Sequence, residues 1–291
     1  MIFFTLPNLH FNFHINQFIA FLAKEKPYLF KIPVTFSYVT GNFPYSCWNG
    51  RYNNNIGPFM DYDEINKFLK ANALPLRLNC ANVCLTERDY EDAISHTALN
   101  LCQNGSNAIE ISDLTFYQYL KDKYPDYKFV FSNQADLKNE MTAEIINTLL
   151  EQNLFQLIQI PEHQSTNLDF LKSIENKKNI ELQVNTSGCP ITCKNYLQCK
   201  LNQHITQYDY SEQDFYSACK DNKLYQNIKP LITIEDIQNI YLPLGITHYS
   251  LAEMPLKNAN DFLDFFLNYF IKEEYRQEVL IDFLQKQNKR K

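Results

Sequence analysis

The stretch Glu181-Leu-Gln-Val-Asn185, followed at once by Gly188-Cys189-Pro190 and then by Cys193, is the most informative part of this sequence. Leu182 and Val184 belong to a short apolar run, which is typical of a buried strand. Ligands and cofactors sit past the ends of strands in parallel α/β folds, so thiols at this place indicate a metal centre. The next cysteines along the same segment are Cys199 and Cys219.

Short apolar runs recur along the whole chain, and a helical pattern follows most of them. The expected strands are Ile2–Leu6, Val34–Tyr38, Leu74–Leu78, Ala108–Ile111, Lys128–Ser132, Phe155–Ile160, Ile180–Val184 and Ile246–Ser250. The expected helices lie near residues 14–24, 62–71, 87–103, 113–123, 137–150, 167–175 and 233–241. Strands that alternate with helices predict an α/β fold, here a single (β/α)8 TIM-type barrel over residues 1–291.

Three further expectations follow from the barrel. A C-terminal helix at about 256–288 carries an apolar stripe and should pack on the outside. Two long loops, at 40–60 and 186–230, follow the second and seventh strands and should emerge at the C-terminal face, where barrel active sites lie. The barrel interior should be filled by apolar strand residues such as Phe36, Leu76, Ile109, Phe129, Ile158 or a neighbour, and Leu182.

Composition narrows the class of protein. The chain has 291 residues, of which 45% are hydrophobic, and a net charge of −6, which argues against a broad nucleic-acid surface. It has no apolar run of about 18 residues, so we expect no membrane span. The N-terminus does not read as a signal peptide. Eight cysteines without a secretory signal predict a reducing, cytoplasmic compartment, where clustered cysteines more often bind metal than form disulfides.

The cysteine group has three interpretations. Four thiolates suit an iron–sulfur cluster, and the favoured ligands of a 4Fe-4S cluster are Cys189, Cys193, Cys199 and Cys219, with Cys47 as a substitute for any of them. Zinc is the alternative, with His204 completing a set of three cysteines and one histidine. Structural zinc sites favour C-x2-C knuckles, which this chain lacks. In the third interpretation these are ordinary semi-buried thiols.

Candidate substrate-binding residues lie on the long loop after the second strand and at strand ends. Arg51 offers a fork for a carboxylate or phosphate, and Trp48 beside Asn49 offers a stacking face. Past other strands lie Asn82, Ser132 and Asn185, which either orient a ligand or satisfy loop backbone. Neither an H-E-x-x-H nor a G-x-S-x-G motif is present, so hydrolysis has no motif support.

Several of these segments resemble the collagenase-like peptidase family (peptidase family U-thirty-two). The resemblance is carried by Val184-Asn185, Gly188-Cys189-Pro190 and Cys193, by Glu110-Ile-Ser112-Asp113, and by Leu244-Gly245-Ile246. It implies a barrel with a four-iron cluster that carries out oxygen-independent hydroxylation, or a related redox modification, of a small molecule or RNA. Two alternatives remain: a non-catalytic, metal-stabilised barrel that serves as a partner subunit to another protein, and a peptidase.

Overall fold

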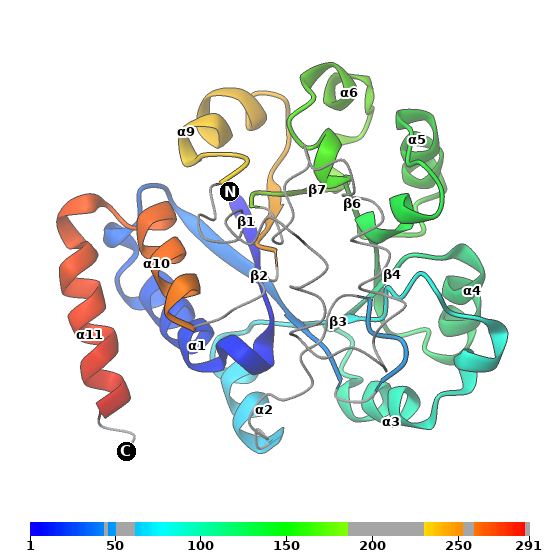
Figure 1. Ribbon diagram of the computed structural model, residues 1–291, viewed down its shortest axis with the longest axis horizontal. Helices are drawn as coiled ribbons and strands as arrows, with labels where there is room; N and C mark the ends of the chain where they lie inside the picture. Colours follow the sequence, from blue (N-terminus) through cyan, green and yellow to red (C-terminus); the bar gives the residue numbers. More distant parts are fainter. Residues whose placement is uncertain (44–45, 51–61, 186–229, 253–258, 289–291) are drawn as a thin grey trace, which may run out of the picture.

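The computed structural model describes residues 1–43, 46–50, 62–185, 230–252 and 259–288. Its strands form a closed barrel in the order β1 to β8, and each pair of neighbours is parallel (Figure 1). The predicted (β/α)8 barrel is therefore confirmed. The strands are β1 (Ile2–Leu6), β2 (Val34–Gly41), β3 (Leu76–Asn79), β4 (Ala108–Ile111), β5 (Lys128–Phe131), β6 (Leu157–Gln159), β7 (Ile180–Gln183) and β8 (His248–Ser250).

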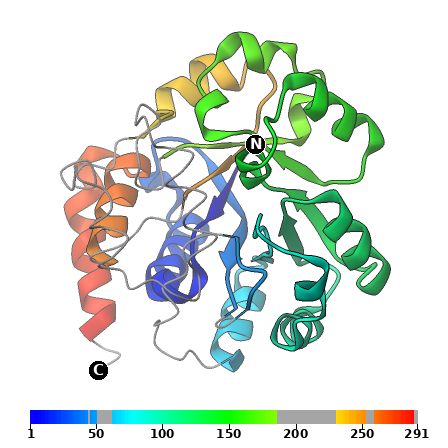
Figure 2. The same cartoon turned by 45° about the vertical axis from the view of Figure 1, so that its right-hand side comes forward.

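Helices surround this barrel as an outer layer (Figure 2). The α-helices are α1 (Leu9–Glu25), α2 (Tyr62–Ala71), α3 (Ala93–Cys102), α4 (Leu114–Lys123), α5 (Ala143–Gln152), α6 (Leu168–Ser173), α9 (Ile234–Asp236), α10 (Ala259–Phe270) and α11 (Arg276–Asn288). Short helical turns named in the text are η2 (Glu87–Glu91), η3 (Asn133–Leu137), η4 (Glu162–Gln164) and the π-helical η7 (Ile237–Tyr241).

Two expected helices are each broken into two. The helix expected at 87–103 is η2 followed by α3, because Asp92 between them is extended and its side chain accepts a hydrogen bond from the Ser95 N–H as the N-cap of α3. The helix expected at 256–288 is α10 followed by α11. Ile271 separates these two, where it forms an antiparallel bridge with Phe30.

The predicted filling of the barrel interior was wrong except on β6, where Leu157, the neighbour of Ile158, lies in the interior. Leu76, Ile109 and Leu182 are buried, but they lie in the apolar layer between strands and helices together with Phe36, Phe129 and Ile158. The neighbours of Leu76 and Leu182 in sequence, Arg77 and Glu181, bond to each other across the barrel. Because successive side chains of a strand point to opposite faces, the leucines point outward.

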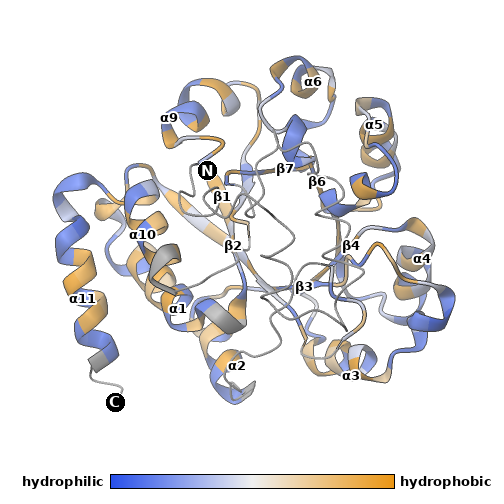
Figure 3. Cartoon of the chain, viewed as in Figure 1, coloured by the Kyte–Doolittle hydropathy of each residue, from blue (hydrophilic) through white to orange (hydrophobic). Residues whose placement is uncertain are grey.

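α10 closes the outer wall beside β1 and β2 with aromatic side chains. Phe270 packs edge-on against Phe4 at 4.8 Å and against Phe36 at 6.2 Å between ring centroids. Much of α10 is hydrophobic in Figure 3, as the apolar stripe in the sequence predicts. Within the described ranges, no helix is long and apolar enough to cross a membrane.

Candidate functional site

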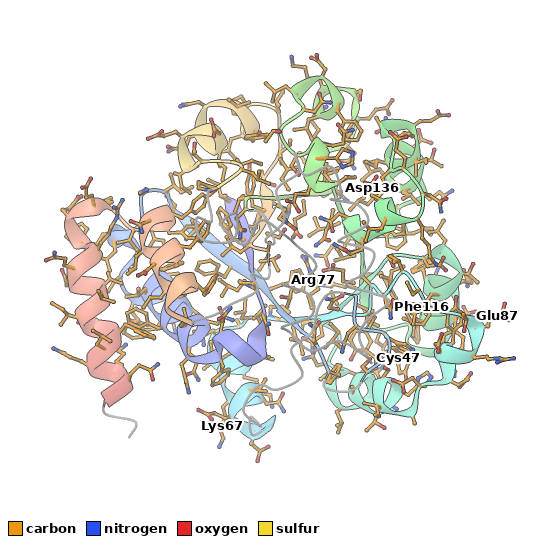
Figure 4. All side chains as sticks on the ribbon, viewed as in Figure 1. Cys47, Lys67, Arg77, Glu87, Phe116 and Asp136 are labelled. Carbon is orange, nitrogen blue, oxygen red and sulfur yellow. The ribbon has the colours of Figure 1, made fainter. Side chains whose placement is uncertain are left out.

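The barrel interior holds a buried ion pair. Arg77 on β3 donates from Nη1 to Glu181 Oε1 at 2.7 Å and from Nη2 to Glu181 Oε2 at 2.8 Å. Glu181 lies on β7, so the pair spans the barrel, and Figure 4 shows Arg77 inside the ring of strands. The side chains are 0% and 1% exposed. Thr5 on β1 donates a third hydrogen bond, to Glu181 Oε2 at 3.0 Å.

Further polar side chains extend the Arg77–Glu181 pair toward the C-terminal end of the barrel. Gln159 Nε2 donates to Glu181 Oε1 at 2.9 Å and to Glu110 Oε2 at 3.3 Å. Ser132, directly past β5, donates to Glu110 Oε1 at 2.8 Å. A continuous buried network therefore runs from Arg77 to Ser132. Ser132 was expected to bind substrate, and the structure places its hydroxyl in this network.

The charges of the network stabilise one another. Burial raises the pKa of the Glu181 carboxyl, but the Arg77 charge and the hydrogen bonds from Arg77 and Gln159 outweigh it and lower that pKa to about 2. Arg77 Nη1 is also 3.9 Å from Glu110 Oε2. One guanidinium thus faces two carboxylates. An apolar plug of Tyr38, Ala108, Val130 and Leu157 lies in the barrel beside it, with Arg77 Cζ 4.9 Å above the Tyr38 ring.

Trp48 is part of the packing at the C-terminal end of the barrel. It is 0% exposed, and its indole Nε1 donates to the Asp89 carbonyl oxygen at 2.6 Å. Its ring meets those of His96 on α3 and Phe116 on α4 edge-on, with centroids 4.9 and 5.1 Å away. Sequence reasoning expected a stacking face for a ligand at Trp48. The structure instead buries the Trp48 ring completely among protein side chains, so Trp48 anchors the loop.

Asn49 and Asn82 stabilise loop backbone. Asn49 Nδ2 donates to the Phe43 carbonyl at 2.6 Å, and Asn82 Nδ2 donates to the Cys47 carbonyl at 2.7 Å. The Asn82 side chain therefore joins the loop after β3 to the loop after β2. For Asn82 this is the loop-stabilising alternative given above, whereas for Asn49 it differs from the expected role in substrate binding. Arg51, the other candidate on this loop, lies outside the described residues.

Four thiols lie in the described ranges, and no disulfide joins them. They are Cys47, Cys80, Cys84 and Cys102. Cys47 Sγ points to the Asp89 carbonyl oxygen at 3.7 Å, on the side of α3 and α4 where Figure 4 labels it. Burial raises the pKa of the Cys80 thiol, and the charges of Glu110 and Cys47 raise it further. Among the described residues, no three His, Cys, Asp or Glu side chains form a group that could hold a metal ion.

The four favoured cluster ligands, Cys189, Cys193, Cys199 and Cys219, lie outside the described residues. The residues on either side of the cysteine segment are nevertheless described. The chain leaves the barrel at Asn185 and returns at Pro230, and these two residues form an antiparallel bridge. Leu231 N–H donates to the Val184 carbonyl at 2.8 Å. Asn185 itself is fully buried, and its Oδ1 accepts from the Ala252 N–H at 2.8 Å.

The carboxylate of Asp136 and the imidazole of His163 lie close together past the ends of β5 and β6. Asp136 in η3 and His163 in η4 follow β5 and β6, and His163 Nδ1 is 3.5 Å from Asp136 Oδ2. The backbone N–H of Met141 donates to Asp136 Oδ1 at 2.8 Å. Gln183 on β7 donates to Glu162 Oε2 at 3.2 Å, which ties η4 to the end of β7.

Sequence reasoning missed the interior network, although a signal for it was present. A polar residue stands between two apolar ones in each of four strands, at Arg77, Glu110, Gln159 and Glu181. In a strand buried on both faces, such alternation marks a polar inner face. His163 stands beside Glu162 in the sequence and belongs to no recognised motif. Its partner Asp136 is distant in sequence, so no local pattern indicated the pair.

Comparisons with known proteins support the fold. No family model matches the chain, and no curated protein matches it. The solved structure of the U32 peptidase Mk0906 superposes with a TM-score of 0.55 at 12% sequence identity, covering 87% of this chain and 93% of that one. This similarity shows that the chain has a fold like that of a U32 peptidase.

Proposed function

We propose that this protein is an iron–sulfur barrel enzyme that carries out an oxygen-independent hydroxylation, or a related redox modification, of a small molecule or RNA. The observation that carries the proposal is the bridge between Asn185 and Pro230. This bridge anchors a segment with four of the eight cysteines to the C-terminal end of β7. Barrel enzymes build their active sites at this end.

The chemistry of the donors suits a four-iron cluster. Such a cluster takes four thiolates, which Cys189, Cys193, Cys199 and Cys219 would supply. Cys47 is a weaker substitute, because its thiol points to the Asp89 carbonyl oxygen among the helices. A bound cluster supplies one-electron redox chemistry. Side chains at the C-terminal mouth of the barrel, above the buried network that ends at Ser132, would bind the substrate.

Anaerobic purification followed by iron and sulfide analysis tests this proposal. We expect a brown protein with about four irons and four sulfides per chain. Replacing Cys189 or Cys193 with serine should remove the visible absorbance. The matched control is Cys102→Ser, because burial raises the pKa of Cys102 to about 11 and keeps this thiol protonated in the helix layer. Zinc in place of iron, or no metal after anaerobic reconstitution, would contradict the proposal.

A peptidase is the second candidate, because the structural neighbour Mk0906 is a U32 peptidase. Peptide hydrolysis needs an activated nucleophile or a metal with an open position. The buried Ser132 hydroxyl donates to Glu110, so it is not placed as such a nucleophile. Incubation with gelatin and a mixed peptide library, followed by mass spectrometry, separates the candidates. Cleavage by metal-free protein would favour the peptidase.

A further inference from the structure

Asp136 and His163 form a close carboxylate–imidazole contact past the C-terminal ends of β5 and β6. Asp136 is 8% exposed, and the Met141 N–H fixes one of its oxygens at 2.8 Å. Its other oxygen is 3.5 Å from His163 Nδ1, while the His163 side chain is 31% exposed. A buried carboxylate on one ring nitrogen sets the tautomer of a histidine and leaves the other nitrogen available.

We propose that His163 is the proton-transfer residue at the mouth of this barrel, with Asp136 as the residue that orients it. The proposal rests on the proposed function, because a proton-transfer residue serves a reaction at the mouth. With Nδ1–H directed to Asp136, the Nε2 lone pair takes a proton from an O–H or N–H group of the substrate. The resulting imidazolium lies against the Asp136 carboxylate and later returns the proton, so His163 is regenerated.

The other described histidines have different surroundings. His96 uses both ring nitrogens within the helix layer, Nδ1 with the Tyr124 hydroxyl at 2.7 Å and Nε2 with the Tyr90 carbonyl at 3.0 Å. His248 on β8 stacks on Phe3 with centroids 4.8 Å apart. His14 lies on α1 in the outer layer. Among the histidines whose side chains the structure describes, His163 alone directly follows the C-terminal end of a strand with a carboxylate at Nδ1.

The position of η4 relates His163 to the cysteine segment. Gln183 donates both to Glu162 Oε2 at 3.2 Å and to the Asn185 carbonyl at 2.8 Å. The residue next to His163 in sequence is thus bonded to the end of β7, from which the segment at 186–229 departs. A proton-transfer group here would lie one strand away from the start of the proposed redox segment. Hydroxylation and most redox modifications of organic substrates move protons as well as electrons.

Two further carboxylates, Glu162 and Glu140, lie near this pair. Asp136 contacts His163 directly, Glu162 is its neighbour in sequence, and Glu140 lies near Asp136. Burial raises the pKa of Asp136, and the charge of Glu140 adds to this, whereas the Met141 N–H and the His163 charge lower it.

The first test is nitrogen-15 NMR of the full chain with labelled histidine, purified anaerobically and titrated from pH 5 to 9. We expect neutral His163 to be the Nδ1–H tautomer, and Asp136→Asn to shift the tautomer ratio toward Nε2–H. Glu140→Gln should leave this ratio unchanged, and the His14 signals should be the same in all variants. An Nε2–H tautomer in the wild type, or a tautomer ratio that Asp136→Asn does not change, would overturn the proposal.

The second test uses p-nitrophenyl acetate as the probe of Nε2. The Nε2 lone pair attacks the ester carbonyl, p-nitrophenolate leaves, and water then hydrolyses the acetyl-imidazole to acetate and His163. We expect His163→Asn and His163→Gln to lower the rate by about tenfold or more. Asp136→Asn should also lower the rate, because His163 loses the carboxylate at Nδ1, whereas His14→Asn should leave the rate unchanged. An unchanged rate in both His163 variants would overturn the proposal.

Both tests separate this proposal from the proposed function, because neither needs iron. They are repeated on a Cys189→Ser, Cys193→Ser variant. If the wild-type protein binds no iron but His163 behaves as expected, the cluster proposal fails and the role of His163 stands. If iron is bound but His163 shows the wrong tautomer and no reactivity, the role of His163 fails alone.

Discussion

Arg77 and Glu181 are joined by two hydrogen bonds, at 2.7 and 2.8 Å, across the full width of the barrel. Their strands, β3 and β7, are four positions apart in the strand order, so this pair connects opposite walls. Desolvating two charges costs several kcal/mol each, and close bidentate geometry with further hydrogen bonds offsets that cost. Thr5 and Gln159 supply those further bonds to Glu181.

Removing one partner of this pair should destabilise the protein strongly. Arg77→Met leaves the buried Glu181 carboxylate without the Arg77 cation, so we expect a loss of about 3–5 kcal/mol in the free energy of unfolding. Glu181→Gln should cost less than Arg77→Met, because Arg77 Nη1 still lies 3.9 Å from Glu110. Urea denaturation monitored by circular dichroism measures these losses.

The matched control for that series is the exposed pair Lys172 and Asp169, whose side chains are 60% and 97% exposed. Lys172→Met should change the free energy of unfolding by no more than about 0.5 kcal/mol. The double variant Arg77→Met, Glu181→Leu should lose less stability than the sum of its single variants. A loss for Arg77→Met as small as that for Lys172→Met would show that the buried pair does not stabilise the barrel.

Stability should fall at acidic pH through Glu181. Its folded-state pKa is about 2, below the value of about 4.3 for an unfolded chain. A carboxyl with a lowered folded pKa contributes stability that is fully present above the unfolded pKa and is lost as pH falls through the folded one. We therefore expect a loss on the order of 3 kcal/mol between about pH 4.5 and pH 2. The free energy of unfolding, measured by urea denaturation across this pH range, should depend less on pH for Glu181→Gln than for the wild type.

The outer layer and the order of strands could be predicted from the sequence, and a polar residue between two apolar ones in four strands indicates the inner face, but the contacts inside the barrel could not be predicted. Leu76, Ile109 and Leu182 were correctly expected to be buried, because apolar strand residues in a barrel with helices outside are buried on either face. Their orientation was wrong, since an apolar run alone does not say which face is inward. Arg77 and Glu181 each stand between two apolar residues and so indicate the inner face. Their contact joins residues that are 104 positions apart in sequence, so no local pattern predicts it.

The candidate site was predictable only where function depends on local sequence. The position of the cysteine segment past β7 follows from a strand and the residues after it. The role of Trp48 does not, because its packing depends on Asp89, His96 and Phe116 from later elements. For the same reason the Asp136–His163 pair could not be recognised before the loops after β5 and β6 were placed side by side.

Because Trp48 is the single tryptophan of the chain, its fluorescence should report on folding at the C-terminal end of the barrel. Since it is 0% exposed, we expect a blue-shifted fluorescence emission that acrylamide quenches weakly until the protein unfolds. Trp48→Ala should cost about 3–5 kcal/mol, because it leaves a cavity between α3 and α4 and removes the bond to Asp89. Strong quenching in the native state, or a stable Trp48→Ala variant, would instead fit an open ring that is available to a ligand.

Gly50 is required where the loop after β2 crosses the end of β3. Its N–H donates to Asn79 Oδ1 at 3.2 Å, and a Cβ atom at Gly50 would lie 2.3 Å from the Ala81 carbonyl carbon. Because this neighbour is backbone, it cannot rotate away, and we expect Gly50→Ala to cost about 1–3 kcal/mol in thermal or urea denaturation. Gly41→Ala is the matched control, since its Cβ would meet the Leu76 Cδ1 atom at 2.8 Å, the end of a side chain that can turn. Equal losses for the two variants would mean that the approach of Gly50 to Ala81 does not constrain this loop.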